Sequence, residues 1–477
     1  MKKLILAIAL AAAAAPAAAQ DGGAPPAPPG PAPAPAPAAA QHKPDKDPSK
    51  AVVGRIEDAL KGVFAASAAG RLSARAGLEA ALTDWEAEAK DDPLRAVKWW
   101  RGMLAGTLPA GARHAGIAAE KVAFLDREAT VWISTPKSYG PKSVFPMVLV
   151  VLDRGEDPKK VLPSMYGDLL KEWIVVAVVA DPKEAGFDVV KEPWMAAVGL
   201  RYAIDNLRVD RDRVVIDASP GISNLALSLG AEWAVQFAGF VLRGATTSSP
   251  LVSNLALGSV LALAPEPATD AQKKVVEEVR AAVPGAAFAA EGKGGADAVQ
   301  KWLAALPPRK ISNPETATFS WKTRPQGGEP WGYWLWVFRA ADPKKDRLVT
   351  VTVTRNAAGA VIEVQSDNLA EGILLLNDDV VDLERDLAVK VNGREVWKGK
   401  AERRLRTALS WIEQTGERTL FVPAELRFTV PADLQAPKKD GAGNAPADGD
   451  GAPPPPPPPT SPPPKGGDDS GGGQGGG

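Results

Sequence analysis

Ser219 has the setting in this chain that best suits a nucleophile. It stands in "DRVVIDASPGISNLALSLG" (residues 212–230), which predicts an apolar strand, a corner at Ser219 and then a helix. A serine hydroxyl at such a corner can act as a nucleophile when a neighbouring base takes its proton. The structural alternative is a helix cap, with Pro220 at the first helical position, where a missing N–H costs nothing.

Few residues could activate this serine. The chain has two histidines, His42 and His114, and both precede Ser219. Lys293, in a glycine-rich stretch, could serve as a base only if it lost its proton near neutral pH. Glu266 and Asp270 are the candidates for the acid that would orient a base, although each also suits the start of a helix.

Residues 126–308 alternate apolar runs with helical patterns, which predicts a mostly parallel sheet covered by helices on both faces. The expected helices include Pro193–Leu207, Ala271–Val283 and Ala296–Leu306. The expected strands are Thr130–Ser134, Pro146–Leu152, Trp173–Val179, Val214–Asp217, Phe237–Leu242, Val260–Ala264 and Ala286–Ala290.

Three stretches of this block carry a resemblance to a known family. They are "ATVWISTPKSYGPKSVFPMVLVVLDRG" (129–155), "AIDNLRVDRDRVVIDASPG" (203–221) and "KWLAALPPR" (301–309). Together they resemble the α/β-hydrolase fold, and more narrowly exported esterase or peptidase domains of the dienelactone-hydrolase and prolyl-oligopeptidase kind. The resemblance implies that Ser219 occupies the nucleophile position, with an acid and then a histidine following it in the chain.

The motifs of that family are not intact in this chain. Its elbow G-x-S-x-G is replaced by Asp217-Ala218-Ser219-Pro220-Gly221. Pro220 lacks the backbone N–H that the family uses for the oxyanion, and losing one such donor costs about 10²–10³ in turnover. No histidine follows Ser219. The expectation is a hydrolase fold without its chemistry, a pseudoenzyme that binds a peptide, ester or glycan or acts as a scaffold; the alternative is a weak serine esterase or peptidase.

Residues 315–432 change to alternation with period two, which predicts a smaller antiparallel β-sandwich-like domain. Asn392-Gly393 is a preferred hairpin dipeptide, and Ala401–Gln414 is expected to form a helix. Tryptophans gather at the start of this block. Exposed and coplanar Trp334 and Trp336 would favour a carbohydrate-binding envelope protein, whereas packing in the core is the simpler explanation.

Residues 50–125 are expected to form a helical block, because Val52, Ile56, Leu60 and Val63 recur at helical spacing. Trp99 and Trp100 are expected to pack this block onto its neighbour. The organisation is thus expected to be α/β-hydrolase-like, preceded by helices (50–125) and followed by the β domain (315–432).

Both ends of the chain are expected to lie outside the folded domains. Lys2 and Lys3 precede an apolar run, which predicts a signal peptide over residues 1–19 and export to a periplasm or beyond. Residues 20–48 are a Pro/Ala-rich linker, and residues 436–477 a Pro/Gly-rich tail that is expected to be disordered. No membrane span is expected in the mature chain.

Composition excludes several classes of function. Lys and Arg number 56 against 57 Asp and Glu, so no basic surface for nucleic acid is expected. The chain has no cysteine and lacks the common nucleotide and zinc motifs, so neither a cofactor nor a metal is expected. The acidic stretch "NDDVVDLERD" (377–386) is expected to be a solvated turn rather than a calcium loop.

Overall fold

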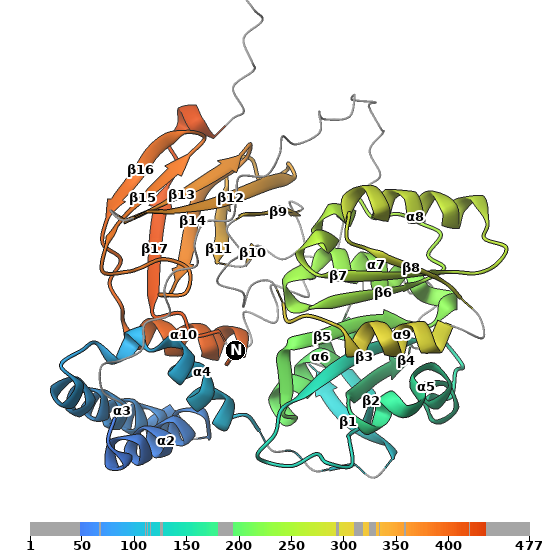
Figure 1. The fold of residues 1–477 in the computed structure, drawn as a ribbon, viewed down its shortest axis with the longest axis horizontal. Coiled ribbons are helices and arrows are strands. Elements are labelled where there is room, and N and C mark those ends of the chain that lie inside the picture. The colour runs from blue at the N-terminus through green and yellow to red at the C-terminus, as the bar shows by residue number, and fades with distance from the viewer. Residues whose placement is uncertain are drawn as a thin grey trace, which may run out of the picture. The chain divides into compact units, whose positions relative to one another are not determined.

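An eight-stranded sheet lies at the centre of the computed structural model (Figure 1). The structure describes residues 48–435, except 66–67, 110, 112, 115, 125–126, 180–193, 292–294, 310–317, 324–330, 333, 357–358 and 419. The strands of this sheet are β1 (Ile117–Phe124), β2 (Arg127–Ser134), β3 (Phe145–Leu152), β4 (Ile174–Val179), β5 (Val209–Ala218), β6 (Gly239–Arg243), β7 (Ser259–Ala264) and β8 (Ala287–Ala290).

The order of the strands is β1-β2-β4-β3-β5-β6-β7-β8. β2 runs antiparallel to both of its neighbours, β1 and β4, while β3 to β8 pair in parallel with one another and with β4. Every residue of β3 is buried, which explains why its sequence is a continuous apolar run rather than an alternation. The predicted mostly parallel sheet is confirmed.

Helices cover both faces of this sheet, as predicted. α6 (Trp194–Asn206), α7 (Ser223–Glu232) and α8 (Asp270–Ala282) contribute to the apolar core on one face. α5 (Pro158–Tyr166) and α9 (Gly295–Ala304) contribute to the core on the other face. The short 3-10 helices of this block are η2 (Gly167–Lys171), η3 (Pro220–Ile222), η4 (Ala234–Gln236) and η5 (Val252–Leu257).

The helical block comprises α2 (Lys50–Ala65), α3 (Ala68–Ala89), η1 (Pro93–Arg95) and α4 (Val97–Gly106). The prediction of helix up to residue 125 was wrong at its end, because residues 117–124 form β1. That stretch pairs along its whole length with β2, and the long-range pairing outweighs its alanine-rich local propensity. Trp100 stacks on Phe421 with ring centroids 5.0 Å apart, so it packs the block onto the β domain. Trp99 instead meets Trp85 and Trp100 of its own block, so the prediction is confirmed for Trp100.

The β domain has a four-stranded sheet, β10-β11-β14-β17, and a five-stranded sheet, β16-β15-β13-β12-β9. Asn392 and Gly393 both have positive φ, 49° and 83°, as a type I′ hairpin turn requires. The strands and helices are β9 (Thr318–Thr323), β10 (Trp331–Gly332), β11 (Leu335–Ala340), β12 (Arg347–Asn356), β13 (Gly359–Ser366), β14 (Leu369–Leu376), β15 (Asp386–Val391), β16 (Arg394–Gly399), α10 (Leu405–Thr415), β17 (Ala424–Thr429) and η7 (Ala432–Leu434).

One pair in this domain departs from the antiparallel expectation. β13 and β15 run parallel, from Gly359↔Asp386 to Val364↔Val391. The chain leaves the five-stranded sheet after β13, forms β14 in the other sheet and returns as β15, so that β15 takes the direction of β13. A crossing of this kind, unlike a hairpin, is invisible to local alternation.

Buried polar side chains join the blocks, and the described residues belong to one compact unit. Asn254 in η5 donates to the carbonyl of Lys322 in β9 and accepts from its N–H, both at 2.7 Å. Arg208, just before β5, donates to the carbonyls of Leu108 and Ala105, both at 2.9 Å. These bonds fix the helical block and the β domain to the block that contains the large sheet.

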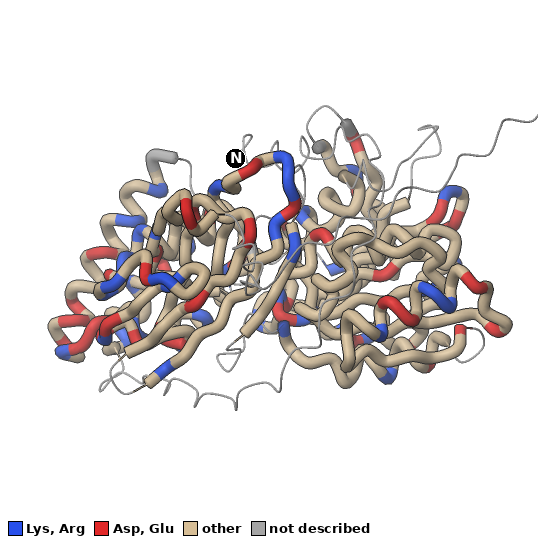
Figure 2. Tube along the Cα trace, turned by 90° about the horizontal axis from the view of Figure 1, so that it is seen from above, with Lys and Arg blue, Asp and Glu red and all other residues tan. Residues whose placement is uncertain are grey.

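Charges of both signs are interspersed along the described chain, as Figure 2 shows. None of the helices described is long and apolar enough to span a bilayer. The predicted signal peptide, linker and tail, together with His42, lie outside the described residues.

Candidate functional site

Ser219 lies at the corner between β5 and the 3-10 helix η3, which leads directly into α7. Its backbone has φ −58° and ψ 152°, an ordinary extended conformation without strain. Pro220 is the first residue of η3, as the cap hypothesis predicts. The other half of that hypothesis was wrong, because the Ser219 hydroxyl accepts no N–H from the helix. It bonds to the loop after β3 instead.

Glu156 and Asp153 hold the Ser219 hydroxyl. The hydroxyl donates to Glu156 Oε2 over a short 2.5 Å. The backbone N–H of Asp153 points at both oxygens, 2.8 Å from Ser219 Oγ and 2.7 Å from Glu156 Oε2. The three atoms form a closed triangle in which each hydrogen has an acceptor.

The hydrogen bonds of this triangle already engage the two groups that acyl transfer would need, the Ser219 hydroxyl and the Asp153 N–H. The N–H of Asp153, in the loop after β3, is at the position from which the fold supplies an oxyanion donor, and it is already bonded to Glu156. Pro220 cannot supply the second donor. The residue Ser219 is 0% exposed, so its hydroxyl does not face solvent. A carboxylate therefore lies where negative charge would have to develop during acyl transfer.

Asp153 adds a second carboxylate at the corner. Its Oδ2 lies so close to Gly221 that a Cβ on that residue would collide with it. The carboxylate also accepts the N–H of Arg154 at 2.7 Å. A side chain at position 221 would therefore have to displace the Asp153 carboxylate from this position.

Asp217, in place of the first elbow glycine, belongs to a buried polar cluster. Arg243, the last residue of β6, donates to its carboxylate through Nε at 3.0 Å and Nη2 at 2.9 Å. The Tyr166 hydroxyl donates to Asp217 Oδ2 at 2.6 Å. Burial and the neighbouring Asp217 raise the pKa of Tyr166 well above its usual value, so the phenol stays neutral and donates. Although burial opposes it, Asp217 raises the pKa of Arg243, which keeps its charge.

Glu291 follows β8, where the resemblance implies the histidine of a triad. Burial raises the pKa of Glu291 above its ordinary value of 4.5, and Asp217 adds to this, while Arg243 acts in the opposite direction. A folded-state pKa above the unfolded one means that the folded chain binds more protons between the two values. The contribution of Glu291 to stability therefore falls as the pH rises through this range.

We expect Glu291→Gln to be as stable as the wild type at pH 4 and more stable at pH 7, because the amide has no proton to lose. Thermal unfolding between pH 4 and pH 8 measures this difference. The control is Glu277→Gln on the exposed face of α8, which should follow the wild type at every pH. A loss of stability in Glu291→Gln at pH 7 would contradict the expectation.

The structure separates the other predicted site residues from Ser219. The N–H of His114 donates to Thr135 Oγ1 at 3.0 Å, and its Nδ1 is 3.8 Å from Glu120 Oε1. Thr135 follows β2, whose Ser134 pairs with Val175 near the start of β4. His114 thus lies where the parallel strands begin, and Ser219 follows the end of β5, so they are at opposite edges of the sheet.

The two acid candidates are exposed residues, Glu266 in the loop before α8 and Asp270 at the start of that helix. Asp270, in the first turn of α8, pairs with Lys273 at 3.1 Å, as a helix-start carboxylate would. Neither Glu266 nor Asp270 has a hydrogen bond to Ser219 among those of the described residues. Lys293 lies outside the residues that the structure describes.

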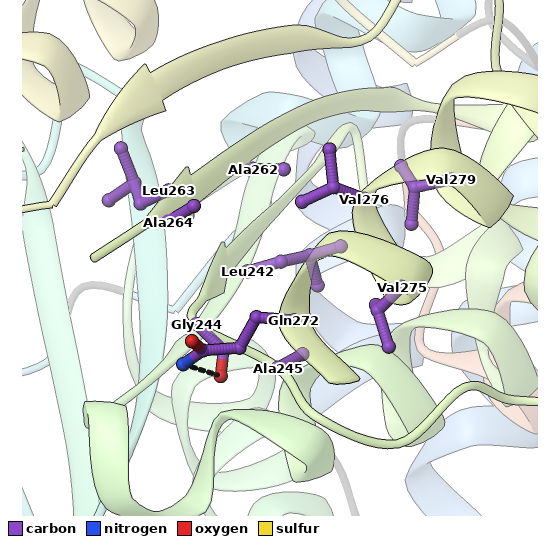
Figure 3. Close-up of a pocket in the computed structure, with 10 residues that line it drawn as sticks. All are labelled: Leu242, Gly244, Ala245, Ala262, Leu263, Ala264, Gln272, Val275, Val276 and Val279. Carbon is purple, nitrogen blue, oxygen red and sulfur yellow. Dashed lines mark hydrogen bonds between the residues drawn. The ribbon is translucent and has the colours of Figure 1, made fainter. Parts of the chain in front are cut away.

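A narrow pocket between β6, β7 and α8 is distinct from the corner at Ser219 (Figure 3). Its lining is mostly apolar, and Gln272 Nε2 donates to the carbonyl of Gly244 at 3.1 Å. Ser219 does not line this pocket, so the pocket adds nothing to the chemistry of the corner.

Trp334 and Trp336 do not form an exposed platform. Trp334 is 5% exposed and meets Phe319 edge to face at 4.9 Å, within the core of the β domain. Trp336 is half-buried and lies 4.9 Å from Trp411 of α10 at 69°. The feature that would favour carbohydrate binding, an exposed and coplanar pair, is absent at these two residues.

The acidic stretch 377–386 is not the solvated turn that was predicted. Asp378 and Asp379 are each 8% exposed. Arg403 donates to Asp378 at 2.6 Å, and Arg101 pairs with Asp379 at 3.0 Å. Among the described residues, no group of three acidic or histidine side chains could hold a metal ion. The pair of Arg101 and Asp379 joins the helical block to the β domain, whereas Asp378 and Arg403 both belong to the β domain.

The strand order of the large sheet, with β2 antiparallel and Ser219 after β5, defines an α/β-hydrolase fold. No model of a known protein family matches the chain, and no curated protein sequence does. Solved structures resemble it only in part. A thermostable esterase is 14% identical with a TM-score of 0.32, over 40% of this chain and 60% of that one.

Two further solved structures show the same partial likeness. A protein from Bacteroides ovatus assigned as a dipeptidyl aminopeptidase IV is 11% identical with a TM-score of 0.34, over 40% of this chain and 36% of that one. The feruloyl esterase module from Clostridium thermocellum is 9% identical with a TM-score of 0.32, over 42% and 94%. The chain thus spans less than two thirds of the length of the first two proteins.

Proposed function

We propose that this chain is an exported protein whose α/β-hydrolase-fold domain binds a partner or acts as a scaffold, without catalysis. One observation carries the proposal. The Ser219 hydroxyl is buried and bonded to Glu156, and the Asp153 N–H that could hold an oxyanion is bonded to the same carboxylate. Export is proposed from the leader-like sequence of residues 1–19. The ligand class retained from the fold is a peptide, an ester or a glycan.

The electrostatics of the corner support this proposal. A serine hydrolase needs donors aimed at the developing oxyanion, whereas this corner presents the carboxylates of Asp153 and Glu156. Asp217, which replaces the first glycine of the elbow, accepts hydrogen bonds from Arg243 and Tyr166. The polar groups at this edge of the sheet thus bond to one another.

A second function has one specific observation in its favour. Glu156 is a titratable group within hydrogen-bond distance of Ser219 Oγ, at 2.5 Å, and a carboxylate can act as a general base. On this alternative the chain is a weak serine esterase or peptidase in which Glu156 replaces the histidine. It requires the corner to open, because Ser219 is buried.

Labelling with a fluorophosphonate probe separates the two functions, because the probe needs an activated serine rather than a particular substrate. We expect the purified protein to label no more than the matched Ser219→Ala control between pH 4 and pH 8. An active serine hydrolase in the same reaction verifies the probe, and circular dichroism verifies that both chains are folded. Labelling that is lost in Ser219→Ala and in Glu156→Gln would overturn the proposal and favour the enzyme.

A further inference from the structure

The corner has the composition of an anion site that is already filled. Two donors, the Asp153 N–H and the Ser219 hydroxyl, converge on one oxygen of Glu156, at 2.7 and 2.5 Å. Charge-assisted hydrogen bonds of this length are about twice as strong as neutral ones. The acceptor is a carboxylate that belongs to the same short segment as one of the donors.

The local chain geometry brings Glu156 back over the corner. Residues 153–156 form a tight turn in which the N–H of Glu156 donates to the carbonyl of Asp153 at 3.2 Å. Gly155 has φ +82°, which permits this turn. Asp157 then caps α5 through the N–H of Lys159. The Glu156 side chain is thus held between a turn and a helix start, beside Ser219.

The site is close to the surface although the hydroxyl itself is buried. Arg154, Gly155, Pro220 and Gly221 are exposed, and Glu156 is only half-buried. Movement of the Glu156 side chain would free the Ser219 hydroxyl, while the Asp153 N–H would keep its second bond, to Ser219 Oγ at 2.8 Å. A ligand oxygen in the place of Glu156 Oε2 would accept the same two hydrogen bonds.

We propose that this corner is a binding site for a carboxylate, and that the chain fills it with its own Glu156. The proposal rests on the proposed function, because it names the ligand class of the same non-catalytic site. A singly charged group fits better than a phosphate, since the Asp153 carboxylate beside Gly221 would repel a second negative charge. In the wild type an outside carboxylate has to displace Glu156, which competes from within the molecule at high effective concentration.

The test is the variant Glu156→Ala titrated with sodium acetate, with chloride used to hold the ionic strength constant. We expect acetate to raise the melting temperature of Glu156→Ala in a saturable manner, with a dissociation constant in the millimolar range. The wild type and Glu277→Ala, which lacks an exposed glutamate of α8, should not respond. Glu156→Ala/Ser219→Ala should bind acetate at least fivefold more weakly, and the neutral analogue acetamide should have no effect.

Three outcomes would overturn the proposal. They are the absence of any acetate response in folded Glu156→Ala, an equal response in the double variant, and tighter binding of inorganic phosphate than of acetate. Fluorophosphonate labelling tests the proposed function separately, so that its failure can be told apart from a failure of the carboxylate site alone. An equal response in the wild type would show that Glu156 does not occupy the site.

A second variant covers the case in which Glu156→Ala does not fold. Glu156→Gln keeps the volume of the side chain but replaces the charged acceptor by a neutral one. We expect the amide proton of Asp153 to move upfield in its NMR spectrum relative to the wild type, because a hydrogen bond to a carboxylate is the stronger of the two. An unchanged position of this resonance would contradict the bond and overturn the site.

Discussion

Replacing Arg243 by alanine should lower the free energy of unfolding by about 3–5 kcal/mol, the usual consequence of leaving one member of a buried ion pair without its partner. The side chain of Asp217 is 0% exposed and that of Arg243 is 6% exposed. Without the guanidinium, the Asp217 carboxylate would keep only the Tyr166 hydroxyl and the N–H of Ala218 as donors. Urea unfolding followed by circular dichroism measures the loss.

Two controls separate the lost pair from lost volume. The triple variant Asp217→Leu/Arg243→Met/Tyr166→Phe replaces the cluster by apolar groups of similar size, and it should be more stable than Arg243→Ala because no buried charge remains. Lys121→Ala removes one member of the exposed pair with Glu128 and should change stability little. A loss below about 1 kcal/mol in Arg243→Ala, the range of exposed pairs, would contradict the expectation.

This cluster also explains why a carboxylate is tolerated at the elbow. From the sequence, Asp217 is an awkward replacement for glycine, since it would add negative charge near a nucleophile. The structure shows that Arg243 neutralises that charge. The elbow of this chain is therefore a packed ionic cluster, which fits a corner that holds two elements together.

The large sheet was predictable because its signal is local. β3 and β4 are buried along their length, so their sequences are unbroken apolar runs, and the helices between them carry the period of 3.6. Thr269 and Gln272 have the three-residue spacing of a capping box, and they form one at the start of α8. Several strands were not predicted, and two of them show why. β1 is rich in alanine and reads as helix, and β14, buried on both faces, lacks alternation.

Of the candidate site, the sequence predicted the position of Ser219 but not the residues that bond to it. Its partner Glu156 stands 63 residues away, after a different strand, and Arg243 is 26 residues from Asp217. Neighbouring parallel strands bring their carboxyl ends to one edge, so a polar residue after β3 was bound to lie near one after β5. Which of Asp153, Arg154 and Glu156 turns inward depends on a turn and on side-chain rotamers, which spacing does not specify.

Glu417→Ala should destabilise the chain by about 3–5 kcal/mol as well, because it leaves two buried guanidinium groups side by side. Glu417 follows α10, is 3% exposed, and pairs with Arg211 at 3.3 Å and with Arg309 at 3.1 Å. Burial, together with Arg309, lowers the pKa of Arg211, and Glu417 opposes that shift. Arg309 has a second carboxylate, Asp212, at 3.1 Å, and its pKa is raised despite its burial. Arg211 is therefore the charged group that loses the most compensation in Glu417→Ala.

The same variant reports on how the segment after α10 is attached to the large sheet, since Arg211 lies in β5. Hydrogen exchange should speed up first in α10 and the residues that follow it, before the sheet itself opens. The matched control is Glu413→Ala in α10. Its pair with Arg75 is more than a quarter exposed on both sides, so its loss should cost far less. Equal effects of the two variants on unfolding and on exchange would mean that the buried cluster does not hold this segment, and the attachment would then rest on the apolar contacts of α10.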